Sequence, residues 1–221
     1  MLELFTPYSV SEVLVFLFKG LGMTLFIATI SICLSFLFGS VLGIARYLGK
    51  GIGARVAAIY IDSVRNIPLL LFILSFRLLL PSVILGIRIP DKAVFSGIVA
   101  MTVFTSAMVA EILRGGLNGI PQGQWEAAAS QGFSHYKTLR YIILPQALRK
   151  ILVPMLGQFV TCLKDTSFLQ VVGISELMMN TTIIMGKFKY SYQVIVLYAL
   201  VALIYYVANI AVLTIAKRIR F

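Results

Sequence analysis

Charged residues are scarce in this chain. Only 12% of its 221 residues are Asp, Glu, Lys or Arg, whereas 60% are hydrophobic, and the mean hydropathy is +0.98. So few charges leave too little polar surface to coat a soluble domain, which indicates a protein that lies in lipid. Acidic residues are the scarcer kind, 8 against 19 basic ones. That excess fits either nucleic-acid binding or basic loops on one side of a membrane, and the placement of the charges decides between them.

Residues that could act in catalysis, bind a metal or form a disulfide are also few. The two cysteines, Cys33 and Cys162, lie in apolar stretches and there is one histidine, so neither a disulfide framework nor a zinc site is predicted. The nearest approach to a phosphate-binding loop runs from Gly43 to Lys50, but its glycine spacing is one residue too long and Gly51 replaces the required Ser or Thr. No nucleophile is paired with a plausible base. We therefore predict no catalytic residue, no metal and no cofactor in this chain.

Long apolar segments dominate the sequence instead. A helix that crosses a bilayer needs roughly 20 apolar residues, and the runs 20–45, 93–110 and 191–216 contain no charge. Two further apolar stretches, 59–85 and 151–174, are interrupted by charges. None of them has the alternation of a barrel strand. We predict an all-α integral membrane protein, a single domain over 1–221, with about five transmembrane helices at roughly 20–46, 56–86, 92–113, 147–170 and 191–217.

Basic residues gather in alternate connections between these spans. They follow the first span, separate the third from the fourth and end the chain, whereas the other connections carry both signs. Loops rich in Lys and Arg stay in the cytoplasm, so the N-terminus is predicted outside and the C-terminus inside. This placement explains the net charge without nucleic acid. The basic residues on the predicted cytoplasmic side are Arg46, Lys50, Arg55, His135, Lys137, Arg140, Arg149, Lys150, Lys217, Arg218 and Arg220.

The first span contains a pair of glycines four residues apart. Gly39 and Gly43 form a GxxxG pattern, which lets another helix approach closely. We interpret it as ordinary packing within a helix bundle.

The connection between the third and fourth spans is too patterned for a plain linker. Residues 126–129 favour a helix, and Gly132 suits a left-handed helix end. Ser134 can cap a following helix, and Pro145 marks a further break. Segment 121–145 is therefore predicted to form a short helix, a bend and a second helix. From the residues alone, it either docks into a partner or lies as an amphipathic helix on the membrane surface.

The spacing of Glu126-Ala127-Ala128, Gly132 and Leu144-Pro145 resembles the EAA loop of permease subunits of binding-protein-dependent ABC importers. The resemblance extends over nearly the whole chain and is to the polar amino-acid uptake family, its glutamine permeases in particular. The other stretches that carry it are Arg65-Asn66-Ile67-Pro68-Leu69-Leu70, Ala110-Glu111-Ile112 with Arg114-Gly115-Gly116, and Leu163-Lys164-Asp165-Thr166-Ser167.

This resemblance implies a type I ABC importer permease fold in a bacterial cytoplasmic membrane, working by alternating access. It implies three partners: an ABC ATPase homodimer that holds ATP and magnesium, a second permease, identical or different, and an extracellular or periplasmic amino-acid-binding protein. The chain itself would then not be an enzyme. The residues that the resemblance assigns to ATPase coupling are Glu126, Ala127, Ala128, Gly132, Leu144 and Pro145.

Two other classes of protein remain as alternatives. An ion-coupled secondary transporter or channel without an ATPase partner would have similar spans, but the chain shows no internal repeat. A membrane-embedded enzyme would need a catalytic cluster, and none is visible.

Charges within a span are costly and usually face a cavity, which makes Lys164 and Asp165 the leading substrate-site candidates. Gln158, Cys162 and Asp165 fall on one face of a helix. We expect Asp165 to bind the α-ammonium group of an amino acid, although a structural Lys–Asp pair is the alternative. The whole predicted substrate-binding set is Arg77, Met108, Gln158, Thr161, Cys162, Lys164, Asp165, Thr166 and Ser167.

Two further residue assignments concern cargo and gating. Relatives for basic amino acids can carry an acid at the position of Gln158, so the neutral amide favours glutamine, followed by glutamate or a basic amino acid. Glu111 and Arg114 lie three residues apart on one helix face. The resemblance implies a gating ion pair there, and a helix-end pair of little energetic weight is the alternative.

Overall fold

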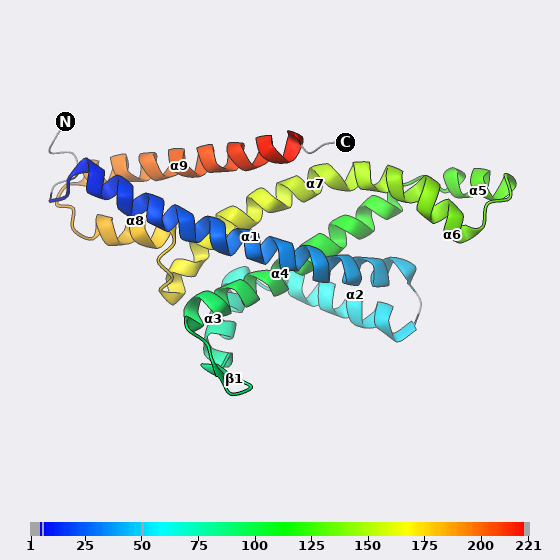
Figure 1. Ribbon diagram of the computed structural model, residues 1–221, viewed down its shortest axis with the longest axis horizontal. Coiled ribbons are helices and arrows are strands. Elements are labelled where there is room, and N and C mark those ends of the chain that lie inside the picture. Colours follow the sequence, from blue (N-terminus) through cyan, green and yellow to red (C-terminus); the bar gives the residue numbers. More distant parts are fainter. Residues whose placement is uncertain (1–4, 6, 50, 219–221) are drawn as a thin grey trace. The chain divides into compact units, whose positions relative to one another are not determined.

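The computed structural model describes residues 5, 7–49 and 51–218 (Figure 1). Lys50 and Arg220 of the predicted cytoplasmic set lie outside the described residues. Contacts within the chain group it into two compact units. Unit 1 comprises Met1–Ser31, Leu69–Met101 and Val160–Phe221, and unit 2 comprises Ile32–Pro68 and Thr102–Phe159. The single permease domain over 1–221 stays a prediction.

Helices make up almost all of the regular structure within the described residues, which confirms the predicted all-α class (Figure 1). In chain order the helices are α1 (Val10–Leu48), α2 (Gly51–Arg65), α3 (Leu69–Leu79), α4 (Lys92–Asn118), α5 (Gln122–Ser130), α6 (His135–Thr138), the π-helix η1 (Leu139–Ile143), α7 (Leu144–Asp165), the 3-10 helix η2 (Thr166–Val172), α8 (Leu177–Met185) and α9 (Ser191–Arg218). Helices α1, α4 and α7 contribute residues to both units.

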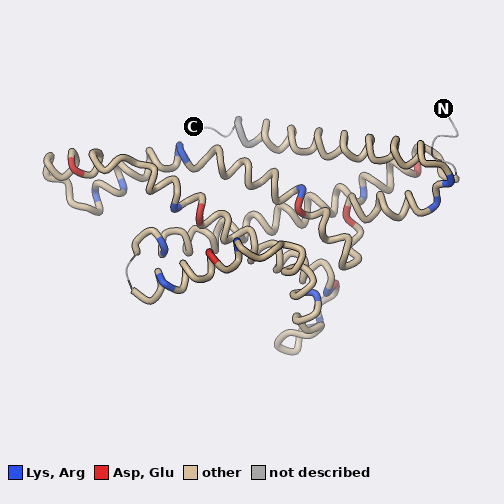
Figure 2. Tube along the Cα trace, turned by 180° about the vertical axis from the view of Figure 1, so that it is seen from behind, with Lys and Arg blue, Asp and Glu red and all other residues tan. Residues whose placement is uncertain are grey.

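The described helices provide three to five candidate membrane spans. Helices α1, α4 and α9 are each long and apolar enough to cross a bilayer alone. Two interrupted pairs qualify only when each is counted as one span: α2 with α3, and the segment His135–Val172 with α8. Figure 2 shows how sparsely the charges are distributed, with none on the long helix α9 over residues 191–216.

Helix α1 begins at Val10, well before the predicted span 20–46, because a capping box starts it. The backbone N–H of Ser9 donates to Glu12 Oε2 at 2.8 Å, and the backbone N–H of Glu12 donates to Ser9 Oγ at 3.2 Å. These reciprocal bonds satisfy N–H groups that have no partner within the helix. The sequence signal was the pair of residues Ser9 and Glu12.

The predicted span 56–86 is not one helix. Helix α2 ends at Arg65 and α3 begins at Leu69, because Pro68 has no N–H and disfavours helical geometry in the residue before it. A small antiparallel hairpin follows, with β1 (Val83–Ile84) paired to β2 (Ile87–Arg88). Its two turn residues, Leu85 and Gly86, both have positive φ, as the type I′ form of a two-residue hairpin turn requires.

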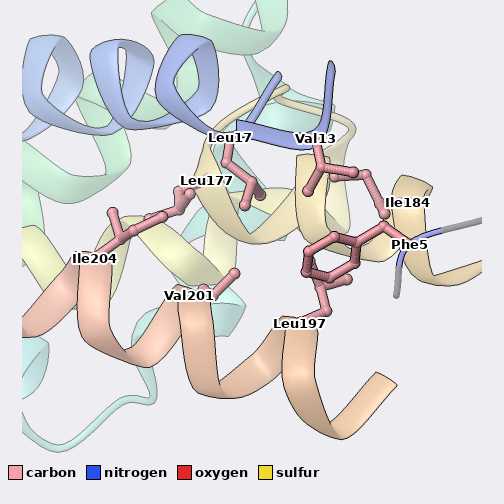
Figure 3. Packing of buried hydrophobic residues seen from close by; sticks show 8 residues of the cluster. All are labelled: Phe5, Val13, Leu17, Leu177, Ile184, Leu197, Val201 and Ile204. Atoms are coloured by element: carbon pink, nitrogen blue, oxygen red, sulfur yellow. The ribbon is translucent and has the colours of Figure 1, made fainter. Parts of the chain in front are cut away.

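The core of unit 1 joins α1, α8 and α9 (Figure 3). Val13 and Leu17 of α1 meet Leu177 of α8 and Leu197 of α9, and each of these side chains is at most 2% exposed. The remaining members of this cluster are Phe5, Ile184, Val201 and Ile204.

A fully buried carboxylate, Glu176, lies beside this core. It caps the N-terminus of α8 by accepting hydrogen bonds from the backbone N–H groups of Met178 at 2.8 Å and Met179 at 2.7 Å. The hydroxyls of Thr24 on α1 and Tyr205 on α9 donate to its Oε2, both at 3.5 Å. One side chain therefore connects the same three helices as the apolar core.

Replacing Glu176 with alanine is expected to destabilise the protein by about 1–3 kcal/mol, because two backbone N–H groups and two hydroxyls lose a buried acceptor. The melting temperature of the purified chain in detergent measures this loss. Glu12→Ala is a matched control, since Glu12 also caps a helix but is exposed, so water can replace it. Equal melting temperatures for the two variants would show that burial of Glu176 does not matter.

Unit 2 is built on the second half of α4. Val109, Leu113 and Leu117 of this helix pack against Ile143 at the end of η1 and Ile151 of α7. The predicted glycine pair lies against the same helix: a Cβ at Gly39 would come within 2.6 Å of the Ser106 carbonyl oxygen, and one at Gly43 within 2.6 Å of that of Ala110. The GxxxG pattern is thus a contact within one chain.

Candidate functional site: an ion-pair network and an exposed loop helix

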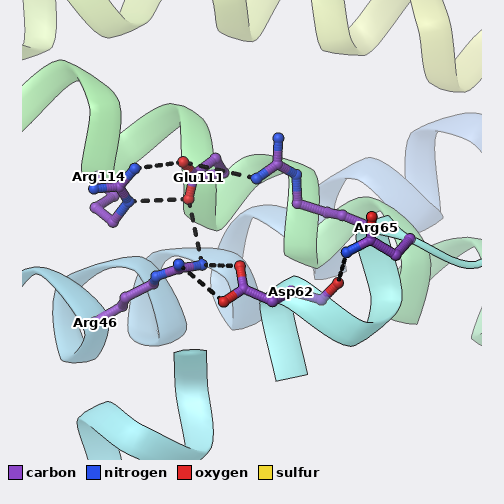
Figure 4. Close-up of polar contacts among 6 residues, drawn as sticks. Arg46, Asp62, Arg65, Glu111 and Arg114 are labelled. Carbon is purple, nitrogen blue, oxygen red and sulfur yellow. Dashed lines mark hydrogen bonds and ion pairs between the residues drawn. The ribbon is translucent and has the colours of Figure 1, made fainter. Parts of the chain in front are cut away.

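Five charged residues from three helices form a network in unit 2 (Figure 4). Arg46 lies in the last turn of α1, Asp62 and Arg65 lie near the end of α2, and Glu111 and Arg114 lie on α4. Three guanidinium groups meet two carboxylates, so the network has a formal charge of +1.

Glu111 is the centre of the network. Arg114 donates to both of its oxygens, from Nε to Oε2 at 3.0 Å and from Nη2 to Oε1 at 2.6 Å. Nη1 of Arg46 lies 3.5 Å from Oε2, and Nη1 of Arg65 lies 3.7 Å from Oε1. The carboxylate of Glu111 is therefore approached by cations from α1, α2 and its own helix.

A second forked pair supports the first. Arg46 donates from Nη1 to Asp62 Oδ1 at 2.8 Å and from Nη2 to Oδ2 at 3.1 Å. The side chain of Asp62 is 56% exposed, whereas those of Arg46 and Glu111 are 21% and 22% exposed. Paired donors fix both distance and orientation, which a single contact does not.

The structure brings the predicted pair Glu111 and Arg114 together, while their gating role stays a prediction. Arg46 and Asp62 were missed as part of this site. In the sequence, Arg46 belongs to the basic connections and Asp62 is one of the charges that interrupt the apolar stretch 59–85, so neither is predicted as a site residue. The available signal was an acid and a base in neighbouring apolar segments, each in need of a partner.

The predicted loop helix is α5, and it is mostly exposed. Ala128 is buried, whereas Glu126, Ala127 and Ala129 face outward. Gly132 follows in the left-handed region at φ +79°. Its N–H donates to the Ala129 carbonyl at 2.9 Å, so the helix ends in the manner expected of a glycine.

The bend after α5 is held by three contacts. The rings of Trp125 and His135 stack with centroids 4.6 Å apart, and Phe133 N–H donates to the Ala128 carbonyl at 3.1 Å. Ser134 Oγ accepts from Lys137 N–H at 3.4 Å, as the N-cap of α6. The chain then passes through η1 into α7.

The break predicted at Pro145 lies elsewhere. Pro145 is in the first turn of α7, which continues directly from η1, and it has no N–H to donate to a carbonyl of the preceding turn. The irregularity comes just before it, in the π-helix Leu139–Ile143. The coupling roles of Leu144 and Pro145 remain predictions, and both residues are exposed.

The predicted substrate residues fall on several elements. Gln158 of α7 and Met108 of α4 belong to unit 2 and are partly exposed. Arg77 is in the last turn of α3, in unit 1. The remaining residues of the set lie at the end of α7 and the start of η2, in unit 1: Thr161 and Lys164 are exposed, Asp165 and Ser167 are partly exposed, and Cys162 and Thr166 are buried.

The hydroxyl of Thr166 donates to the Leu163 carbonyl at 2.8 Å. That bond to the end of α7 leaves the hydroxyl turned inward, so a hydrogen bond from Thr166 to a substrate would need a rotation of its side chain. The substrate contacts of the whole set remain predictions.

These features together define a multi-pass membrane protein that has an exposed helix in a loop between spans and ion pairs linking its spans, with no cluster of three or more metal ligands among the described residues. Residues 35–221 match the family described as the binding-protein-dependent transport system inner membrane component. The chain belongs to this family. It is therefore a permease subunit of an ABC importer in the bacterial cytoplasmic membrane and not itself an enzyme, and the family implies ATPase and binding-protein partners.

Individual relatives are similar over almost their full length. The chain is 40% identical to the probable glutamine ABC transporter permease protein of Bacillus subtilis, over 94% of each chain. It is 31% identical to the glutamine transport system permease protein of Escherichia coli K12, over 92% of this chain and 90% of the relative. A crystal structure described as an amino acid ABC transporter with histidines matches with a TM-score of 0.80 and 30% identity, over 94% of both chains.

Proposed function

We propose that this chain is the membrane-spanning half of an ATP-driven importer for polar amino acids, with glutamine as the preferred cargo. The observation that carries the proposal is the 40% identity over 94% of both chains to a probable glutamine permease. The neutral amide at Gln158 supports the same cargo, because it offers no negative charge to a basic side chain. Glutamate and basic amino acids follow as weaker candidates.

In this proposal the energy for transport comes from a partner subunit that hydrolyses ATP. An ABC ATPase homodimer binds ATP and magnesium, and its closure moves the permease through α5 and the bend after it. Two features support this coupling role: α5 has an exposed face, and the Trp125–His135 stack fixes its orientation. The family assignment favours an ATP-driven importer over an ion-coupled secondary transporter.

The remaining partners follow from the same reasoning. A second permease, identical or different, completes the pathway, and an amino-acid-binding protein delivers cargo to the outer side. The alternation of basic loops supports an external N-terminus and a cytoplasmic C-terminus. Glu111 and Arg114 then act near the cytoplasmic end of the pathway, as a gating pair that alternating access opens and closes.

A reconstituted complex tests the cargo. We expect glutamine, presented by the binding protein, to stimulate ATP hydrolysis and to accumulate in vesicles at least tenfold more than arginine at equal concentration. Hydrolysis is measured as phosphate release and uptake with radiolabelled amino acids. Preferential uptake of arginine would overturn the choice of glutamine, and uptake that needs an ion gradient but no ATP would overturn the importer itself.

A further inference from the structure

Arg46 has an unusual position in the ion-pair network, because it contacts two carboxylates on two different helices. Its forked bond to Asp62 has distances of 2.8 and 3.1 Å, and its Nη1 also lies 3.5 Å from Glu111 Oε2. Figure 4 shows the guanidinium group of Arg46 beside the Asp62 carboxylate, with a further dashed line that joins it to Glu111. A guanidinium fork can hold one acid in two bonds and still attract a second.

Neither of the other two cations, Arg114 and Arg65, can position Glu111 against a neighbouring helix as well as Arg46 can. Arg114 is on the same helix as Glu111, three residues away, so their pair cannot by itself set the position of α4 against a neighbouring helix. Arg65 does come from another helix, but its contact is 3.7 Å long and its side chain is 40% exposed, where water and salt weaken an ion pair. Arg46 is closer to Glu111 and only 21% exposed.

We propose that Arg46 is a positioning residue for the Glu111–Arg114 pair. Asp62 holds its guanidinium group at the end of α1, and Arg46 then fixes the Glu111 carboxylate by attraction across the gap to α4. In this arrangement Arg46 stays fully paired with Asp62 when the Glu111 side chain turns away with Arg114, so the contact between Arg46 and Glu111 can break and reform while each charge keeps a partner. The inference rests on the proposed function, since it assigns Arg46 to the gate of an importer.

A structural role and a positioning role predict different results for a charge exchange. In the double variant Arg46→Asp with Asp62→Arg, the bridge between α1 and α2 is restored with reversed polarity. Position 46 then presents a negative charge to Glu111, which repels it. If Arg46 only fastens α1 to α2, the exchange rescues function. If Arg46 positions Glu111, the exchange restores stability alone.

The test uses the complete complex in lipid vesicles, with glutamine as the probe and three readouts: basal ATP hydrolysis, glutamine-stimulated hydrolysis and the melting temperature. We expect Arg46→Gln to reduce the ratio of stimulated to basal hydrolysis at least fivefold, while Arg46→Lys keeps more than half of it. The exchange variant should melt near the wild-type temperature and still show the fivefold loss. Arg55→Gln is the matched control, because Arg55 is exposed on α2 and has no salt bridge within the described part of the chain.

The outcomes distinguish a failure of the proposed function from a failure of the positioning role of Arg46. A wild-type complex without glutamine-stimulated hydrolysis contradicts the proposed function. A coupled wild-type complex in which Arg46→Gln behaves like Arg55→Gln, or in which the exchange variant regains the full ratio, overturns the positioning role and leaves the importer assignment intact.

Discussion

Replacing Gly132 with valine is expected to reduce glutamine-stimulated ATP hydrolysis by the assembled complex at least tenfold. Gly132 has φ +79°, and a Cβ there would meet no other atom within 4 Å. The effect of valine is therefore backbone strain and not a clash with neighbours. The left-handed conformation costs a residue with a Cβ about 1–2 kcal/mol, and a β-branched side chain is among the least tolerated there.

The consequence for function follows from what the turn holds. Gly132 and Phe133 donate their N–H groups to carbonyls in the last turn of α5, so relaxing the turn changes the angle at which α5 leaves α6. A partner that binds the exposed face of α5 would then meet this helix in the wrong orientation. Hydrolysis and co-purification of the ATPase with the permease are the two measurements.

Two controls distinguish turn geometry from general damage. Gly132→Asn should retain most of the stimulated hydrolysis, because asparagine tolerates positive φ better than other residues. Gly53→Ala lies on α2, outside the loop helix, where a Cβ would also meet nothing within 4 Å, and should behave as wild type. If valine at position 132 proves as harmless as Gly53→Ala, α5 and its bend do not couple the permease to the ATPase.

Local signals in the sequence predicted the helices well. Apolar runs without charge located α4 and α9, although α4 continues beyond the predicted end at 113 to Asn118, and residues 126–129 with Gly132 marked α5 and its end. These features depend on residues within a turn or two of one another. The capping box at Ser9 and Glu12 was a signal of the same kind and explains why α1 begins early.

Contacts between helices could not be predicted from the sequence. The pair Glu111 and Arg114 was predictable because residues three apart on a helix share a face. Arg46 and Asp62 are on different helices, so their contact depends on the rotation and offset of α1 against α2, which no spacing reveals. Glu176 was missed because glutamate is not a preferred N-cap residue, and because its burial against Thr24 and Tyr205 depends on contacts between helices.

The residues of the π-helix η1 carry no signal of their own. Its residues Leu139–Ile143 include ordinary helix formers, and nothing in their types favours a wider turn over an α-helix. Pro145 predicts a break, but the chain stays helical there, from η1 into α7, and the irregularity lies in the turn before the proline. A residue type can show where a regular helix must stop, but not which of two helical geometries precedes it.

Replacing Gly43 with alanine is expected to destabilise the protein by about 1–3 kcal/mol, the usual cost of an added methyl group in a packed contact. The new Cβ would lie 2.6 Å from the Ala110 carbonyl oxygen and 3.1 Å from its Cα. Both atoms belong to the backbone of α4, so no side chain can turn aside. Helix propensity acts in the opposite direction, since alanine favours a helix by up to about 1 kcal/mol over glycine.

The sign of the change therefore shows whether packing or propensity dominates, and Gly22→Ala on the same helix provides the reference. A Cβ at Gly22 would meet nothing within 4 Å, so this variant should melt at or slightly above the wild-type temperature. Gly43→Ala should melt roughly 2–12 °C lower, given about 2–4 °C per kcal/mol for a chain of this length. Adding Gly39→Ala, whose Cβ would lie 2.6 Å from the Ser106 carbonyl oxygen, should lower the melting temperature further. If both alanine variants of the pair raise it as Gly22→Ala does, α1 and α4 are not in close contact at these glycines.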